Sequence, residues 1–415
     1  MIRTDVVVLG GGIVGVAAAL HLQQRGRSVV LVDRAGVAAE TSYGNAGLIQ
    51  REGVVPYPFP RDPLLMARYA FNLLPDANVH WSALPKLAPW LFRYWRASTP
   101  ERMAATARAM RPLIERCVSE HEVLMRDAGI AALARHTGYL RVYRSPQALD
   151  AAILKDRRDR EAYGVNFEPV DAGRLAELEP HLRGSLAGGI LMPDPVSVAD
   201  PAAVVRAYAA LLEARGGRIV TGDARTLRGE AAGWQVETGA GPVTGAAAVV
   251  ALGPWSDDIF RPLGYAIPLG IKRGYHLHFR PEGNATLQRP VLDAQNGYVL
   301  APMSAGIRLT TGVEFAERDA PPSPAHLRRV EPRAREIFPL GTPVETAPWL
   351  GRRPCLPDML PMIGRAPRHD GLWFDFGHHH LGFTLGPVTG RLLAEMMTGQ
   401  TPFTDPAPYR ADRFM

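Results

Sequence analysis

Three glycines near the start of the chain have the spacing of a phosphate-binding turn. Gly10, Gly12 and Gly15 form a G-x-G-x-x-G pattern, and Asp33 follows further along. In such a turn the first glycine permits a tight bend, the second lets a pyrophosphate approach the backbone, and the third lets a helix pack closely on a strand. The Asp33 carboxylate can accept hydrogen bonds from a ribose hydroxyl and would repel a 2′-phosphate. The pattern predicts a dinucleotide site, and it fits NAD and FAD equally well.

The residues around these glycines predict the elements that position the turn. Asp5–Leu9 is a β-branched run typical of a buried parallel strand, Ile13–Gln24 is an Ala-rich helical segment, and Ser28–Val32 is a second apolar strand. The helix would begin at the turn, where its free N–H groups and positive dipole end attract phosphates. This strand–turn–helix context favours a nucleotide site over an ordinary connecting loop.

Composition limits the other function classes. The chain has 415 residues, of which 47% are hydrophobic and 21% charged, and its formal net charge is +6. This length has room for two or three domains. A mildly basic balance suits an anionic cofactor, an anionic substrate or a membrane surface, and the sequence lacks the dense Lys/Arg block that would favour nucleic acid. Because Cys117 and Cys355 lie far apart without a C-x-x-C pattern, we expect neither a disulfide framework nor a metal site.

The expected location follows from the absence of targeting signals. The first strand begins within a few residues of Met1, and no apolar run reaches the length of about 18 residues expected of a spanning helix. We expect a cytoplasmic protein, or one bound peripherally to the inner face of a membrane. Residues 56–112 bear on this choice because prolines alternate there with aromatic helical pieces. The richest aromatic cluster comprises Trp81, Trp90, Phe92, Tyr94 and Trp95; it forms either a cap packed on the body or a lid or membrane patch.

The order of expected elements predicts an α/β fold. A helix over Val198–Arg215, with Asp200 as N-cap and Pro201 at its first position, leads to a strand at Arg218–Thr221, whereas residues 267–315 switch to strands. The pattern predicts a Rossmann-like cofactor domain interrupted by a mixed-sheet α+β substrate domain. We expect the cofactor domain in residues 1–55, 196–264 and 346–415, and the substrate or cap domain in residues 56–195 and 265–345.

Further motifs occur in the order found in one enzyme family. They are Glu40-Thr41-Ser42 with Asn45-Ala46-Gly47, Gly253-Pro254-Trp255-Ser256, Lys272-Arg273-Gly274-Tyr275 with an Arg inserted before the Gly, Gly351-Arg352-Arg353-Pro354, and Gly377-His378 with Leu381-Gly382-Phe383 and Gly386. With the opening turn, they resemble the D-amino acid dehydrogenase branch of the FAD-dependent amine and amino-acid oxidoreductases, which includes D-amino acid oxidase, glycine oxidase and sarcosine oxidase. The resemblance runs from end to end and is weakest in residues 56–135.

The resemblance implies that FAD is held by residues spread over these motifs. The implied set is Gly10, Gly12, Ile13, Val14, Gly15, Asp33, Arg34, Thr41, Ser42, Asn45, Ala46, Gly47, Leu48, Ala224, Gly253, Trp255, Arg353, His378, Leu381, Gly382, Phe383 and Thr384. Gly382 and Gly386 would precede a last helix over Val388–Met397, whose N-terminus could face the flavin pyrimidine carbonyls. Cys355 lies at a different offset from that of the cysteine that binds flavin in sarcosine oxidase, so we expect non-covalent FAD.

Arg353 is the residue that we expect to bind substrate. A guanidinium binds a carboxylate through two parallel hydrogen bonds, which would direct the substrate Cα–H toward the flavin. In glycine oxidase-like relatives the Arg of the G-x-R-P element holds the substrate carboxylate, and Arg353 matches it; the alternative is a structural salt bridge. The resemblance also implies an aromatic residue near the substrate at Tyr298, for which the alternative is sheet packing.

Three other residues are weaker candidates for the site. Strand alternation directs one of Tyr275 and His276 to the site and the other away, and Tyr275 is retained as a catalytic candidate. His378 is the histidine that the resemblance selects from the closing loop. His379 and His380 extend it to a three-His run, which is not expected to hold a metal because adjacent residues in one loop seldom converge on one ion.

The activity implied by the resemblance is hydride transfer from the Cα of an amino acid to flavin N5, followed by hydrolysis of the imine to a 2-oxo acid and ammonia. The substrate would be a D-amino acid or a related cyclic imino acid such as D-proline or hydroxyproline, and the acceptor a membrane quinone or an electron-transfer partner. The alternatives are an oxidase that uses oxygen, an FAD-binding protein without turnover, and an NAD-dependent dehydrogenase. Only the first turn fits NAD, whereas residues 40–47 and 376–386 fit FAD.

Overall fold

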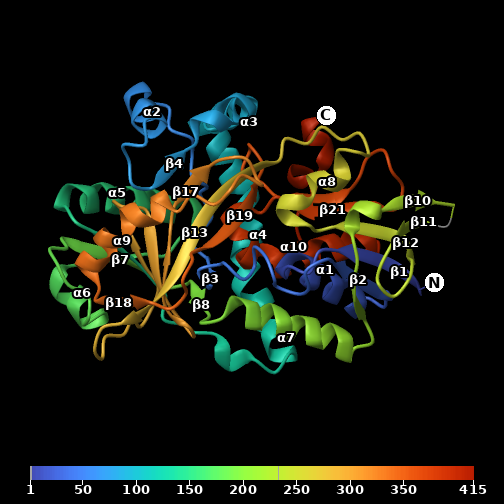
Figure 1. The fold of residues 1–415 in the computed structure, drawn as a ribbon, viewed down its shortest axis with the longest axis horizontal. Coiled ribbons are helices and arrows are strands. Elements are labelled where there is room, and N and C mark those ends of the chain that lie inside the picture. Colours follow the sequence, from blue (N-terminus) through green and yellow to red (C-terminus); the bar gives the residue numbers. More distant parts are fainter. Residues whose placement is uncertain (1, 232) are drawn as a thin grey trace.

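Two large β-sheets organise the residues that the computed structural model describes, 2–231 and 233–415. Figure 1 shows them side by side: the sheet built around β1 (Ile2–Leu9) lies on the right, near both termini, and the sheet built around the long strand β13 (Gly270–Pro281) lies on the left. Helices accompany both sheets. The α/β class predicted from the sequence is confirmed.

The first sheet has a parallel centre. Its order is β21 (Leu372–Phe376), β12 (Val243–Val250), β1, β2 (Val29–Asp33) and β9 (Arg218–Thr221), and β10 (Arg228–Glu230), β11 (Gly233–Val236) and β20 (Met362–Arg365) join it antiparallel. Both faces are buried, as a parallel sheet requires: Val6 and Val8 belong to one core cluster, and Val7 and Leu9 to the other. The cluster of Val6 and Val8 includes residues of α1 (Ile13–Gln24), α7 (Pro201–Ala214) and α10 (Gly382–Met397). The predicted helix over Ile13–Gln24 is confirmed.

The second sheet is mixed. Its order is β4 (Ala77–Val79), β17 (Val313–Phe315), β13, β16 (Gly306–Thr310), β15 (Tyr298–Met303), β14 (Val291–Asp293), β5 (Tyr139–Tyr143), β7 (Gly188–Met192) and β6 (Glu168–Val170), and β18 (Leu340–Pro343) and β19 (Trp349–Cys355) also pair with β13. α9 (Ala325–Ile337) packs into the core on one face. β19 belongs to this sheet although it falls in residues 346–415, which we assigned to the cofactor domain. The remaining domain boundaries stay predictions.

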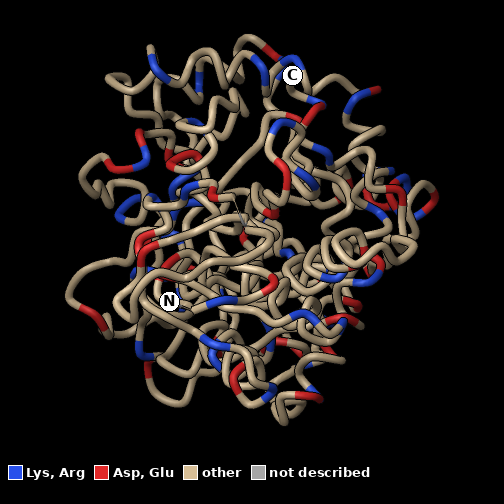
Figure 2. Tube along the Cα trace, turned by 90° about the vertical axis from the view of Figure 1, so that its right-hand side faces the viewer, with Lys and Arg blue, Asp and Glu red and all other residues tan. Residues whose placement is uncertain are grey.

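Other helices lie around the two sheets (Figure 1). They are α2 (Pro63–Ala70), α3 (Leu84–Ala97), α5 (Pro146–Tyr163), α6 (Ala172–Leu178) and α8 (Asp257–Phe260), whereas α4 (Pro100–Asp127) packs in the core beside α1 and α10. A small pair of strands, β3 (Leu48–Ile49) and β8 (Val196–Ser197), lies apart from both sheets. Within the described chain, no helix has the length and apolar character needed to cross a bilayer. Figure 2 shows acidic and basic residues interspersed over the side formed by the first sheet.

The last helix begins six residues earlier than predicted. Gly382 and Gly386 lie inside α10 rather than before it, and Pro387 lies in its second turn. Proline has no N–H to bond the carbonyl four residues earlier, which is that of Phe383. His121 of α4 supplies a donor instead, because its Nε2 lies 2.7 Å from the Phe383 carbonyl oxygen. The predicted start at Val388 was wrong: the donor for the Phe383 carbonyl comes from α4, and a partner so distant in sequence has no local signal.

Replacing His121 by phenylalanine should therefore loosen the start of α10. The ring is fully buried, and burial lowers its pKa to about 4, so it is neutral at pH 7 and donates from Nε2. Leaving the carbonyl without a donor should reduce the free energy of unfolding by about 1–3 kcal/mol, measured by urea denaturation. The matched control is His136→Phe, because the His136 side chain is 60% exposed and its loss should cost little stability. Equal stability of the two variants would contradict the role assigned to His121.

Candidate active site

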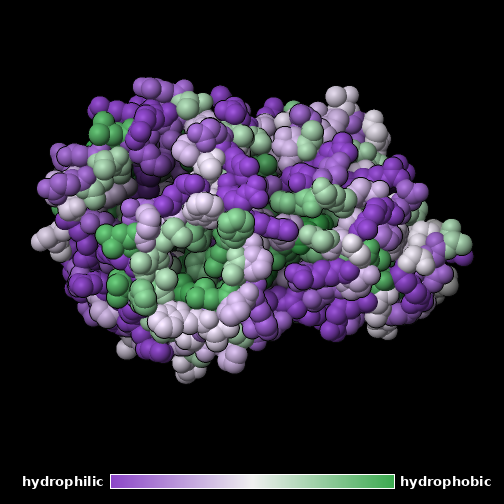
Figure 3. Space-filling model, turned by 90° about the horizontal axis from the view of Figure 1, so that it is seen from above, coloured by the Kyte–Doolittle hydropathy of each residue, from purple (hydrophilic) through white to green (hydrophobic). Residues whose placement is uncertain are grey.

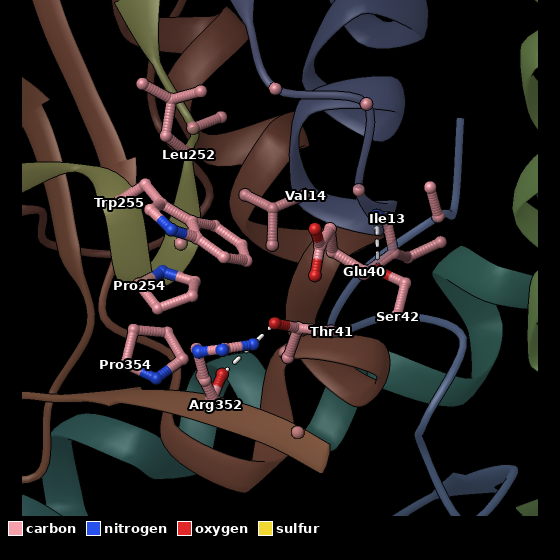
Figure 4. A pocket seen from close by; sticks show the side chains of 18 of the residues that line it. Ile13, Val14, Glu40, Thr41, Ser42, Leu252, Pro254, Trp255, Arg352 and Pro354 are labelled. Carbon is pink, nitrogen blue, oxygen red and sulfur yellow. Dashed lines mark hydrogen bonds between the residues drawn. The ribbon is translucent and has the colours of Figure 1, made fainter. Parts of the chain in front are cut away.

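A long cavity opens at the carboxyl ends of β1 and β2 and extends to β19 and the turn that precedes α10. Its walls come from both sheets: Gly10, Asp33 and Ala224 line one part, and Arg353 and Gly382 another. Figure 4 shows its middle portion. Crevices outside the carboxyl ends of parallel strands are where open α/β sheets bind ligands, so the fold places this cavity where a nucleotide site is expected.

The glycine turn has the geometry that the sequence predicted. Gly10 has a φ of +118°, and a Cβ there would lie 2.4 Å from the carbonyl oxygen of Ala251. A Cβ at Gly15 would lie 2.0 Å from the Gly10 carbonyl oxygen, so this glycine is needed for close packing of helix and strand. The Ile13 N–H donates to Ser42 Oγ at 3.0 Å (Figure 4). The bare backbone and the first turn of α1 thus form a cradle that fits a diphosphate.

Asp33 stabilises this turn from the tip of β2. Its Oδ2 accepts from the Gly11 N–H at 2.7 Å, and its Oδ1 accepts from the N–H groups of Ala35 and Gly36 at 2.8 and 2.9 Å. Asp33 also lines the cavity, beside Arg34 and Ala224. A carboxylate oxygen has more than one acceptor site, so these bonds leave capacity for a ribose hydroxyl.

Trp255 borders the middle of the cavity from the turn after β12. The guanidinium of Arg34 lies 4.8 Å from the Trp255 ring centroid, and that of Arg352 lies 5.8 Å from it. Figure 4 shows Trp255 and Pro254 on one side and Arg352 and Pro354 next to them, with Thr41 donating to the Arg352 carbonyl at 3.1 Å. The structure therefore brings together predicted residues from three separate motifs.

Some predicted cofactor residues support the site from behind. Those that do not border this cavity are Gly15, Ala46, Gly47, Leu48, Leu381 and Thr384. The Gly47 carbonyl accepts from the Val198 N–H at 2.8 Å. Thr384 Oγ1 accepts from the Gln50 N–H at 3.0 Å and donates to the Leu48 carbonyl at 3.3 Å. It therefore connects α10 to residues 48–50. Direct contact of these residues with FAD stays a prediction.

Arg308 connects the loop of residues 43–45 to the second sheet. This buried residue of β16 donates from Nη1 to the carbonyl oxygens of Tyr43, at 3.1 Å, and Asn45. Burial lowers the pKa of Arg308 to about 10, which still leaves it charged at pH 7. The sequence analysis missed Arg308, because nothing near it in sequence indicates a contact with residues 43–45.

Arg353 is a fixed guanidinium on the cavity wall. Its Nη1 donates to the Gly312 carbonyl at 2.7 Å and its Nη2 to the Thr311 carbonyl at 3.2 Å. Among the described residues, no Asp or Glu oxygen lies within 4 Å of it, and burial lowers its pKa. A Cβ at Gly274 would lie 2.6 Å from Nη2, so this glycine makes room for the side chain. The remaining N–H groups can bind an anion.

Strand alternation identifies the other residues on this wall. Trp349, Gly351 and Arg353 are alternate residues of β19, and Gly274 and His276 lie opposite them on β13. The rings of His276 and Trp349 stack with centroids 4.8 Å apart. Burial lowers the pKa of His276 to about 2, so its ring is neutral. The sequence analysis missed Trp349, which counting back by twos from Arg353 would have found.

Tyr275 and Tyr298 need correction as substrate residues. Both pack in the core cluster that includes α9, although Tyr275 also borders the cavity. The Tyr275 hydroxyl accepts from the Ser323 N–H at 2.7 Å and donates to Glu314 at 3.0 Å. Tyr298 is fully buried, and its hydroxyl donates to the Arg333 carbonyl at 3.1 Å. Both Tyr275 and His276 border the cavity, but the tyrosine hydroxyl is engaged with Ser323 and Glu314, whereas the histidine ring stacks on Trp349 at the cavity wall.

His378 lines the cavity, but its ring is engaged with α10. Nε2 lies 3.0 Å from Thr389 Oγ1 and 3.3 Å from Asp375 Oδ1, and burial raises the pKa of Asp375. These contacts fix the His378 ring in the loop that precedes α10 and do not support a catalytic role for it. Contact of this loop with the cofactor stays a prediction. No cluster of three or more His, Cys, Asp or Glu in the described parts of the chain is arranged to hold a metal.

Comparison with known proteins agrees with this geometry. Residues 5–396 match a family model described as FAD dependent oxidoreductase. A D-amino-acid oxidase of Bradyrhizobium diazoefficiens is 30% identical, with 99% of each chain covered, and a D-amino acid dehydrogenase of Methylobacterium nodulans is 32% identical, with 96% of each covered. A glycine oxidase structure from Geobacillus kaustophilus has a TM-score of 0.75 at 22% identity, with 100% of both chains covered. The structure of L-proline dehydrogenase from P. horikoshii has a TM-score of 0.73 at 19% sequence identity, and the match covers 100% of this chain and 98% of that chain.

Proposed function

Because the chain belongs to the family of FAD-dependent oxidoreductases, we propose that it oxidises D-amino acids, or related cyclic imino acids such as D-proline and hydroxyproline, at the Cα–N bond. The observation that carries this proposal is the Arg353 guanidinium, which lies half-buried on the cavity wall without a carboxylate partner in the described chain. The two sequence relatives named above support the D configuration. The solved structures share only the fold.

One set of residues would hold the cofactor, and another would orient the substrate. When bound, FAD supplies a hydride acceptor at flavin N5. The glycine turn, Ser42 and Asp33 hold its nucleotide part, and Arg353 orients the substrate through its carboxylate. Binding without a covalent link is supported by Cys355, which does not border the cavity and whose thiol pKa is raised by burial.

An anaerobic flavin-bleaching screen tests the proposal. The purified holoenzyme is mixed with D- and L-amino acids, N-methyl amino acids and prolines, and the loss of oxidised flavin absorbance is followed. D-amino acids or cyclic imino acids should bleach the flavin, and bleaching by none of these compounds would refute the proposed activity. Rapid mixing of the reduced enzyme with air-saturated buffer then tests the acceptor: slow reoxidation is expected for a dehydrogenase that uses a quinone or an electron-transfer partner, and fast reoxidation for an oxidase.

Peripheral membrane contact through residues 56–112 forms part of the same proposal. The aromatic cluster divides: Trp90 and Tyr94 are buried, whereas Trp81 and Phe92 are more than half exposed. Other exposed apolar residues nearby are Leu64, Phe71 and Leu73, and basic residues in the segment include Arg61, Arg68, Arg93 and Arg96. Figure 3, which looks down on the end that carries α2 and α3, shows apolar surface around a hollow. Mixed apolar and basic surfaces suit anionic bilayers.

Sedimentation with lipid vesicles tests this contact. The holoenzyme should sediment with vesicles that contain phosphatidylglycerol, and the double variant Leu73→Ser, Phe92→Ser should bind about tenfold more weakly, since each exposed apolar side chain adds insertion free energy. Substitution of the buried Trp90 is avoided because it would disturb packing. Unchanged vesicle binding by the variant would contradict the membrane patch. The expected cytoplasmic location stays a prediction.

A further inference from the structure

A second cavity adjoins the first at the turn that precedes α10. Its volume is about 100 Å³, and it lies between the segment 50–57, α4, α5 and β5. His379 and His380 line both cavities. The ring centroids of His380 and Tyr57 lie 5.4 Å apart, so these two side chains stand at the junction. A ligand bound in the first cavity could extend past them into the second.

His380 also links the second cavity to the expected position of the substrate carboxylate. Burial, followed by the positive charges of Arg353 and Lys272, lowers the pKa of His380 to about 3. The imidazole is therefore neutral, and it borders the first cavity together with the Arg353 guanidinium. A substrate whose carboxylate is held by Arg353 would have its side chain close to this junction.

The charged groups of the second cavity leave one acid unpaired. Arg141 forms an ion pair with Asp156, and Lys155 with Asp159. Glu52 Oε1 accepts from Gln50 Nε2 at 3.1 Å, but Oε2 is buried and has no hydrogen-bond partner in the described chain. Burial raises the pKa of Glu52 to about 7. A cationic group in the cavity would supply the missing partner, because a buried carboxylate is costly unless it is paired.

The rest of the wall suits an alkyl chain. The apolar lining residues are Val55, Met110, Val165, Met192, Met359 and Leu381. Methionine side chains are flexible and polarisable, and they adapt to ligands of different shape. The cavity therefore combines an apolar wall with one uncompensated carboxylate. A ligand with a methylene stem and a positively charged end complements both features.

We propose that the second cavity receives the substrate side chain and that Glu52 pairs with a cationic group at its end. The preferred substrates are then D-amino acids with long, positively charged side chains. This inference rests on the proposed amino-acid oxidation and specifies its substrate class. Acidic side chains fit less well, because they would face the Glu52 carboxylate. The two cations of this wall already form ion pairs, Arg141 with Asp156 and Lys155 with Asp159, and only the Nε of Arg141 lacks a partner in the described chain.

The test compares D-arginine with D-norleucine, whose side chain is unbranched and uncharged. Binding to the FAD-loaded enzyme is measured by anaerobic calorimetry, and flavin bleaching by stopped flow. The wild type should bind D-arginine at least about tenfold more tightly than D-norleucine, and Glu52→Gln should abolish most of this preference while changing D-norleucine binding less than about threefold. The matched control is Glu122→Gln on the surface of α4, which removes the same charge from a side chain that is 48% exposed.

The outcomes separate this inference from the proposed function. Equal affinity of the wild type for D-arginine and D-norleucine would overturn the inference, as would an equal loss of both ligands in Glu52→Gln. If D-norleucine and other uncharged D-amino acids bleach the flavin while D-arginine has no advantage, the proposed function stands and only the Glu52 pairing fails. If D-arginine binds through Glu52 without bleaching, the pairing stands and the oxidation fails.

Discussion

Replacing Arg353 by leucine should lower kcat/KM for D-amino acid substrates by at least about 100-fold, since a charge-assisted bidentate contact is lost at a half-buried site. The guanidinium is already fixed by the carbonyls of Thr311 and Gly312, so its geometry does not depend on the substrate. Leucine replaces part of the apolar stem of arginine but offers no donor, and the substrate carboxylate would face an apolar wall. Steady-state kinetics with an artificial acceptor give the effect, and the visible flavin spectrum shows whether FAD remains bound.

Two companion variants make this result specific. Arg353→Lys keeps the charge without the planar fork and should recover part of the activity. Arg352→Leu removes the neighbouring guanidinium, which lies near Trp255 and donates from Nε to the Arg318 carbonyl at 2.9 Å; it should weaken FAD binding more than it raises the substrate KM. Near-wild-type kinetics for Arg353→Leu would contradict a carboxylate-binding role.

Replacing Gly10 by alanine should abolish FAD binding at micromolar concentrations and destabilise the first sheet. The added Cβ would lie 2.4 Å from the Ala251 carbonyl oxygen, at a φ of +118° that L side chains rarely adopt. The backbone conformation alone costs about 1–3 kcal/mol, and the clash adds to it by forcing β12 and the turn apart. Equilibrium titration of the apoprotein with FAD and thermal unfolding measure the two effects.

Gly26→Ala is the matched control for this change. Gly26 also has a positive φ, +78°, but a Cβ there would meet no atom within 4 Å. Both variants force a positive φ on alanine, which costs more at +118° than at +78°, but only Gly10→Ala adds a clash. The control should therefore keep FAD affinity and lose only about 1–2 kcal/mol of stability. Similar FAD affinities for the two variants would show that the turn tolerates a side chain.

The features that the sequence predicts well depend on residues close together in the chain. The strand–turn–helix unit from Asp5 to Gln24 is one example, because the β-branched run, the glycine spacing and the Ala-rich helix are all local signals. The N-cap at Asp200 is another: its side chain accepts from the Ala203 N–H at 2.9 Å, as an Asp-Pro start indicates. Arg353 was singled out from a motif and lies on the cavity wall, and its role toward substrate stays a prediction.

The features that were missed depend on partners far away in sequence. Tyr298 was expected near the substrate, yet the face that a strand residue occupies is set by register with its neighbours, here β14 and β16. The start of α10 was misplaced because a histidine of α4 bonds the carbonyl left free by Pro387. The pairing of Arg141 with Asp156, which leaves Glu52 alone, likewise joins residues of different elements. Such relations become visible only in three dimensions.

The Arg308 contact has a thermodynamic consequence for the whole chain. Its guanidinium donates hydrogen bonds to the backbone of residues 43 and 45, in the loop that we expect to contact FAD. Its own strand, β16, lies in the second sheet. If FAD binding orders that loop, β16 should therefore become more stable, and any opening of β16 should release the loop. By mutual linkage, cofactor affinity and the stability of the second sheet rise and fall together. Amide hydrogen exchange in β15 and β16 should slow on FAD binding, although neither strand belongs to the nucleotide-binding sheet.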